Sequence, residues 1–70
     1  MIELKRIQEK LIESLKQSGM TQSELGRKIG VGQSSIAHYI KGDILPALDT
    51  FANICQLLDL DPGEILCIKD

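Results

Sequence analysis

Side chains that can hydrogen-bond the edge of a nucleobase gather in one short segment of the chain. Gln33, Ser34 and His38 lie in a stretch that the sequence predicts as a helix over residues 33–41 with its polar side outward. A glutamine amide donates and accepts together, which suits the N6/N7 edge of adenine, and histidine can donate to guanine N7 or O6. A serine hydroxyl pairs with either kind of partner. These residue types favour recognition of base pairs in the major groove of DNA.

Such residues need a rigid framework, and hydrophobic periodicity predicts one made of helices. Leu4, Ile7, Leu11 and Leu15 recur every three or four residues, which predicts an amphipathic helix over residues 2–17. The charged residues of this stretch fall on other sides of the helix and are expected to be solvated. The chain is therefore expected to begin with a helix that buries an aliphatic stripe.

The next two helices are separated by a glycine-containing turn. Thr21 and Glu24 have the spacing of a capping box, which predicts a second helix over residues 22–29. Gly30-Val31-Gly32 interrupts it and favours a tight turn with at least one positive φ. The helix over residues 33–41 follows. The residues predicted to face inward from these two helices are Leu25, Ile29, Ile36 and Tyr39 or Ile40.

Two more helices are predicted after Pro46, which forbids a helix continuing through it. A fourth helix over residues 48–58 is expected to bury Leu48, Phe51, Ala52, Cys55 and Leu58. Asp61 then acts as an N-cap, Pro62 occupies the first helical position, and Glu64 is expected to complete a second capping box. Cys67-Ile68 is expected to form a short extended tail.

The layout around Gly30 is that of a helix-turn-helix, in which two short helices pack at a steep angle. A small residue is needed where the helices approach most closely, and Gly26 stands there. Five apolar residues are spaced to fill the angle between the helices: Leu25, Ile29, Val31, Ile36 and Tyr39.

The segment from Thr21 to Gly42 resembles the helix-turn-helix domains of phage repressors, the Cro/C1 or XRE type. The similarity continues through Pro46 and covers roughly residues 4–67. It implies an all-α fold, a compact bundle of about five short helices like that of lambda repressor. The length of 70 residues allows one domain, over residues 1–70. The resemblance further implies a transcriptional regulator, a repressor that inserts residues 33–41 into the major groove of a double-stranded DNA operator.

The resemblance also assigns roles to individual residues. The positions implied to contact bases are Gln33, Ser34 and His38. The positions implied to contact the DNA backbone are Gln22, Ser35 and Lys41. Ser34 and Ser35 can alternatively be capping residues of their helix, and Gln22 can be a solvated residue of a first turn.

Two positions depart from the family pattern. Members usually carry basic residues after the glycine that ends the recognition helix, whereas this chain has Asp43-Ile44-Leu45, and an acid near phosphate is unfavourable. Gly26 stands where alanine is commoner, which costs about 1 kcal/mol of helix stability. The first departure bears on affinity for DNA and the second on stability.

Charge is unevenly distributed along the chain. The net charge is −2, which is unusual for a nucleic-acid-binding protein. Residues 1–45 hold seven basic residues against five acidic ones, a balance of +2, whereas residues 46–70 hold one lysine against five acids, a balance of −4. A DNA-facing surface built from the first part of the chain can therefore still be weakly positive.

Other function classes find little support in the residues. Cys55, Cys67 and the single His38 do not have the paired spacing of a zinc site, and two buried thiols in a cytoplasmic protein are expected. There is no signal core at the N-terminus and no apolar run of the roughly 20 residues that a membrane span needs. One histidine, with no carboxylate pair and no phosphate loop, leaves no candidate catalytic site, so neither an enzyme nor a cofactor is expected.

Surplus apolar residues suggest a second interacting surface. Ile44, Leu45, Ile54 and Leu57 do not all fit the inward stripe of the fourth helix. Repressors of this type pair as homodimers through their C-terminal helices, and a symmetric pair would place two recognition helices one DNA turn, roughly 34 Å, apart. The alternative function is a protein-interaction module, such as an antitoxin, that binds a protein partner through its acidic and apolar C-terminal surface. The polar character of residues 33–41 favours DNA.

Overall fold

The computed structural model of the chain describes residues 1–69, and within them it forms five α-helices and no strand. The predicted all-α bundle is therefore confirmed. The helices are α1 (Leu4–Gln17), α2 (Gln22–Ile29), α3 (Gln33–Lys41), α4 (Leu48–Leu58) and α5 (Pro62–Ile65). None of the helices in the described part of the chain is long and apolar enough to cross a membrane.

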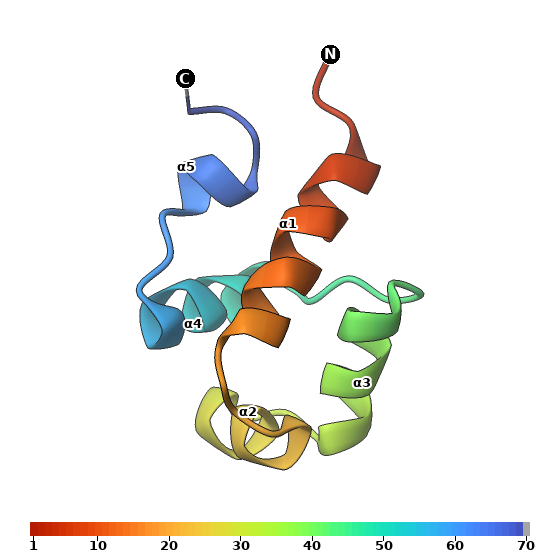
Figure 1. Cartoon of the computed structure of the whole chain (residues 1–70), viewed down its shortest axis with the longest axis vertical. Coiled ribbons are helices and arrows are strands. Elements are labelled where there is room, and N and C mark those ends of the chain that lie inside the picture. Colours follow the sequence, from red (N-terminus) through yellow and green to blue (C-terminus); the bar gives the residue numbers. More distant parts are fainter. Residues whose placement is uncertain (70) are drawn as a thin grey trace.

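The long first helix organises the others around it. In Figure 1, α1 runs through the middle of the molecule, with α2 and α3 towards one end and α5 near the end that holds both chain termini. Helix α3 packs against both α1 and α2, while α4 packs against α2 and α5 against α1. Helices α2 and α3 cross steeply, so that α3 forms one edge of the molecule (Figure 1).

An aliphatic core holds these helices together. Leu15, Leu25, Ile36 and Ile54 are its fully buried members, and they come from α1, α2, α3 and α4 respectively. The other buried residues of the core cluster are Leu11, Ile29, Tyr39 and Ile65. Each of the four longer helices thus contributes one fully buried residue to the centre of the molecule. This packing holds the inner side of α3 in place.

The predicted inward stripe of α1 is only partly buried. Leu11 and Leu15 lie in the core, Ile7 is half-buried, and Leu4 is 55% exposed. The helix also begins at Leu4 rather than at residue 2, because the backbone of Glu3 is extended, with φ −108° and ψ 134°. The first turn of α1 therefore extends beyond the core and leaves an apolar side chain in contact with solvent.

The predicted inward face of α4 is correct for Phe51, Cys55 and Leu58 and wrong for Leu48 and Ala52. Leu48 is 86% exposed and Ala52 is exposed, whereas Ile54, which was expected on a second surface, is 0% exposed. The residues of α4 that bury or partly bury themselves are Phe51, Ile54, Cys55 and Leu58, which also follow helical spacing. Since α4 is apolar on two adjacent sides, periodicity alone was compatible with both orientations.

The two capping predictions have different outcomes. The Thr21 hydroxyl accepts from the Glu24 backbone N–H at 3.1 Å, and the Thr21 N–H donates to Glu24 Oε1 at 3.2 Å, which confirms the first capping box. Hydrogen bonding from the Thr21 backbone, and then from its side chain, lowers the pKa of Glu24. At α5, Asp61 caps through its Oδ1, which accepts from the Gly63 N–H at 2.9 Å.

The prediction that Glu64 completes a second capping box is wrong. Instead of a return bond from Glu64, the remaining carboxylate oxygen of Asp61 accepts from Lys69 Nζ. This bond to Lys69, together with that from Gly63, lowers the pKa of Asp61. The same pairing raises the pKa of Lys69.

The predicted extended tail is also wrong. Cys67 has a φ of 63°, in the left-handed region, and lies in a turn. The backbone N–H groups of Ile68 and Lys69 both donate to the Gly63 carbonyl, at 3.0 and 3.1 Å, so the end of α5 draws the chain back. Cys55 is buried as expected and burial raises the pKa of its thiol, but Cys67 is only half-buried, and both thiols are free.

Candidate nucleic-acid interface

The turn between α2 and α3 depends on two glycines. Gly30 ends α2 with a φ of 90°, a left-handed conformation that favours glycine. The N–H groups of Gly30 and Val31 both donate to the Gly26 carbonyl, at 2.8 and 2.9 Å, so the chain folds back over Gly26. A Cβ atom at Gly26 would lie 2.8 Å from the Val31 carbonyl oxygen and 3.3 Å from the Gln33 nitrogen. The expected close approach at Gly26 is therefore present.

The N-terminus of α3 carries no side-chain cap. Gly32 occupies the N-cap position, and its carbonyl accepts from Ser35 and Ile36 at 3.0 and 3.4 Å. Ser34 and Ser35 therefore do not cap the helix, which removes the alternative role considered for them. The first N–H groups of a helix lack acceptors within it, so the start of α3 offers donors that suit a phosphate oxygen.

Helix α3 turns an apolar side to the core and a polar side to solvent. Ile36 is 0% exposed and Tyr39 is buried, and these two residues attach the helix to the rest of the molecule. Four of the residues singled out from the sequence are exposed: Gln33, Ser34, His38 and Lys41. Helical spacing places them along one side of α3, opposite the buried residues. The fold thus presents a row of hydrogen-bonding side chains to solvent.

The two other predicted backbone contacts lie at the edge of this row. Gln22 and Ser35 are half-buried, each near the start of its helix. Among the hydrogen bonds of residues 1–69, none joins Gln22 to Gln33, so neither residue holds the other in place in the free protein.

Ala37 was not singled out from the sequence. It is half-buried and, by helical spacing, lies between Gln33 and Lys41 on the polar side of α3. A small apolar residue in such a row can contact the methyl group of thymine. The signal that could have found it is its spacing of four residues from Gln33.

The far end of α3 is held by α1. Gly42 ends the helix with a φ of 90°, and its N–H donates to the His38 carbonyl at 2.9 Å. From α1, the Gln8 side-chain amide donates to the Gly42 carbonyl at 3.1 Å. The Cδ1 atom of Ile12 lies close by, 3.6 Å from where a Cβ of residue 42 would stand. These contacts fix both the end of α3 and the direction in which the chain leaves it.

Asp43 is engaged by two of the predicted DNA-contacting residues. Its Oδ1 lies 3.0 Å from Nδ1 of His38, and its Oδ2 lies 3.8 Å from Nζ of Lys41. From the sequence, Asp43 was only an acid placed unfavourably near phosphate. The structure instead makes it the partner of a histidine and a lysine on the exposed side of α3. The signal that could have revealed this is an acid directly after the glycine that ends the helix, within reach of the last turn.

Residues 11–65 match the family described as Helix-turn-helix, which is more than half of the 70-residue chain. The chain belongs to the helix-turn-helix family. The resemblance to the Cro/C1 type is thereby confirmed. Gly26 stands at the close approach of this motif, and Gly30 makes its turn.

Curated relatives of this helix-turn-helix protein are antitoxins by name. Antitoxin HipB of Escherichia coli O6:H1 (strain CFT073) is 43% identical over 44 residues, which cover 63% of this chain and 47% of HipB. Antitoxin HipB of Escherichia coli (strain K12) is likewise 43% identical over 44 residues, covering 63% of this chain and 50% of HipB. The matched region thus spans about half the length of these relatives. No solved structure is similar enough to count as a match.

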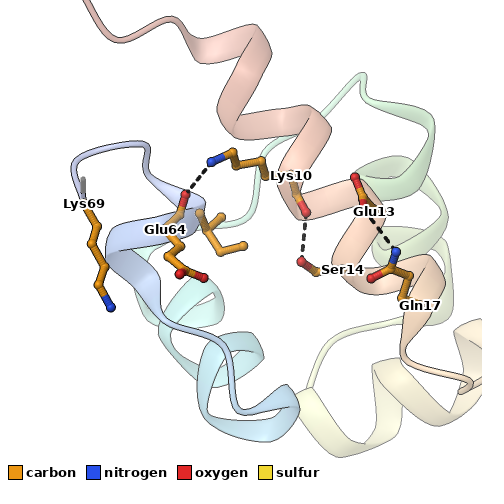
Figure 2. Close-up of a pocket in the computed structure, with 7 residues that line it drawn as sticks. Lys10, Glu13, Ser14, Gln17, Glu64 and Lys69 are labelled. Carbon is orange, nitrogen blue, oxygen red and sulfur yellow. Dashed lines mark hydrogen bonds between the residues drawn. The ribbon is translucent and has the colours of Figure 1, made fainter.

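A polar pocket elsewhere on the helix-turn-helix domain holds no set of candidate DNA-contacting residues comparable to the row on α3. It lies between α1 and the end of the chain, has a volume of about 400 Å³, and receives no residue from α2 or α3 (Figure 2). Lys10 Nζ donates there to the Glu64 backbone carbonyl at 3.1 Å. Its charged residues are exposed, and the described part of the chain holds no group of three or more His, Cys, Asp or Glu residues arranged for a metal. The row on α3 remains the candidate site.

Proposed function

We propose that this helix-turn-helix protein binds a specific double-stranded DNA operator with α3 in the major groove and acts as a transcriptional repressor. The observation that supports this most is the division of α3, with Ile36 and Tyr39 buried and Gln33, Ser34 and His38 exposed on the opposite side. A helix used only for packing against protein would carry apolar residues on that exposed side. The proposal assigns binding, not catalysis, to the chain.

Contacts to the DNA backbone are proposed for the two ends of α3. Near its start, Gln22, Ser35 and the uncapped N–H groups of the helix offer neutral donors, and Lys41 near its end offers a charge. Since few cations are involved, the dependence of affinity on salt should be clear but shallower than that of a strongly basic protein.

The proposal is tested by selection of bound sequences from random duplex DNA at two salt concentrations. We expect one enriched sequence, bound on the order of 10³–10⁷ times more tightly than random duplex at the same salt. Failure to enrich any sequence at the lower salt concentration would remove the proposal and leave the protein-interaction function described below.

Replacing Gln33 with alanine should weaken binding to the selected operator by about 1–3 kcal/mol and relax the preference at one base pair. The reason is that Gln33 is exposed at the start of α3, where a bidentate amide can pair with a base edge. Titration of operators carrying each base pair at every position measures both effects.

Lys41→Ala serves as the matched contrast, because Lys41 is exposed on the same side of α3 but is assigned to phosphate. It should weaken all operators equally and reduce the salt dependence by about one ion. A loss confined to one base pair in Lys41→Ala, or a uniform loss in Gln33→Ala, would contradict the two assignments.

We further infer that two chains pair through an apolar groove. The groove is lined by Leu4, Ile7, Leu11, Leu45, Pro46, Leu48, Phe51 and Leu66. Leu48 and Leu4 are its most exposed members, and their exposure is unfavourable in an isolated chain. Leu48→Lys should therefore yield a monomer at concentrations where the unmodified protein sediments as a dimer. A dimer of unchanged stability in Leu48→Lys would place the contact elsewhere.

A second candidate function is binding of a protein partner. The observation that favours it is the identity of 43% to two proteins named antitoxins, together with the same apolar groove. The two functions separate by experiment, because DNA recognition requires the exposed side of α3, whereas partner binding through the groove does not. Gln33→Ala should leave partner binding intact, and Leu48→Lys should abolish it.

A further inference from the structure

Asp43 is held in a fixed position next to His38 by the backbone as well as by its side chain. The left-handed turn at Gly42, with a φ of 90°, brings the Asp43 N–H to 3.3 Å from the His38 carbonyl. The carboxylate then lies back along α3, with Oδ1 at 3.0 Å from His38 Nδ1. Because Gln8 of α1 also binds the Gly42 carbonyl, this geometry is anchored to the body of the molecule.

The chemistry of the pair fixes which ring nitrogen carries hydrogen. An ionised carboxylate has only acceptor atoms, so a hydrogen bond between Asp43 and His38 requires the hydrogen to be on Nδ1. In the neutral imidazole the other nitrogen, Nε2, then carries a lone pair and is an acceptor. The side chains of His38 and Asp43 are 46% and 43% exposed, so the pair contributes little to stability, and its consequence lies in this choice of tautomer.

We propose that Asp43 is a positioning residue that makes neutral His38 a hydrogen-bond acceptor towards DNA, and so selects a base with an exocyclic amine. In the major groove these are cytosine, through its N4 amine, and adenine, through its N6 amine. Donation to guanine, expected from the sequence, needs a hydrogen on Nε2 and so is available only to the other tautomer or to the charged ring. This proposal rests on the proposed DNA-binding function.

Lys41 completes the arrangement from the same end of the helix. Its Nζ lies 3.8 Å from the other Asp43 oxygen, Oδ2, so the lysine and the histidine use different oxygens of the carboxylate. When Lys41 turns to a phosphate, Oδ1 remains bound to the histidine. The acid after Gly42 thereby acquires a role in base recognition, where a basic residue would have acted only on the DNA backbone.

The tautomer can be measured on the free protein, without DNA. Since the chain contains one histidine, its ring signals need no assignment. Nitrogen-15 NMR of the free protein at about pH 8, where an ordinary imidazole is neutral, should show hydrogen on Nδ1 in the unmodified protein. Asp43→Asn replaces the carboxylate with an amide that can accept or donate, so it should give a mixture of both tautomers. Equal tautomer ratios in the two proteins would overturn the proposal.

The consequence for recognition is measured on the selected operator. The base pair contacted by His38 is the one at which His38→Ala loses preference. There, at about pH 8, the unmodified protein should prefer cytosine or adenine over guanine, and Asp43→Asn should narrow this preference by roughly tenfold. Asp59→Asn is the matched control, since it removes the same charge from an exposed residue at the end of α4. It should leave the base preference unchanged.

The outcomes separate this proposal from the one on which it rests. If the unmodified protein enriches an operator but Asp43→Asn and the unmodified protein share the same base preference, the role of Asp43 is overturned and DNA recognition stands. If the unmodified protein enriches no sequence, the proposed function fails, and base selection by His38 fails with it, whatever the NMR result.

Discussion

Replacing Ile54 with alanine is expected to lower the free energy of unfolding by about 2–5 kcal/mol, the range for a large aliphatic residue deleted from a core. Ile54 is 0% exposed and belongs to the same core cluster as the fully buried residues of α1, α2 and α3, namely Leu15, Leu25 and Ile36. A domain of this size has a thin core, so such a loss removes a large share of its total stability. Denaturant-induced unfolding followed by circular dichroism measures the change.

Leu48→Ala is the matched control for this prediction. Leu48 lies on the same helix and is 86% exposed, so its truncation should change the free energy of unfolding by no more than about 0.5 kcal/mol. Both variants should be unfolded at low protein concentration, because pairing of chains through Leu48 would add a concentration-dependent contribution. A larger loss in Leu48→Ala than in Ile54→Ala would restore the orientation of α4 that periodicity first predicted.

The positions of the helices could be predicted because the sequence carries strong local signals at their ends. Thr21 begins α2, Gly30 ends it, and Gly42 ends α3, and each acts through its own backbone conformation or a hydrogen bond to a near neighbour. The start of α1 was placed less well, since Glu3 provides no side-chain cap. The polar side of α3 could also be predicted, because Ile36 and Tyr39 fix which side of that helix is buried.

The contacts that depend on distant parts of the chain could not be predicted in the same way. Helix α4 offers two adjacent apolar sides, and only its packing against α2 selects the one that contains Ile54. The role of Asp43 was missed for a related reason. The acid after Gly42 is a local signal, but its pairing with His38 needs the left-handed turn at Gly42, which is held from α1 by the bond from Gln8 to the Gly42 carbonyl.

Replacing Gly26 is expected to have the second large effect on stability, because Gly26 lies where α2 and the turn approach most closely. Gly26→Val should lower the free energy of unfolding by about 3 kcal/mol, the upper end of the range for overpacking. The first added atom alone would lie 2.8 Å from the Val31 carbonyl oxygen, a backbone atom that cannot move without displacing the turn. Since that turn sets the direction of α3, affinity for an operator should fall together with stability.

Gly32→Val is the matched control, because it makes the same chemical change six positions further along the chain. It distinguishes destabilisation by a steric clash from destabilisation by the loss of glycine's conformational freedom. Gly32 has an extended conformation, φ −70° and ψ 154°, and a Cβ atom there would meet only the Ser34 hydroxyl oxygen, at 3.7 Å. Valine adopts extended backbone readily, so the expected loss is at most about 1 kcal/mol, from its weaker preference for the N-cap position. Equal losses in the two variants would mean that the contact between Gly26 and Val31 does not constrain the angle between α2 and α3.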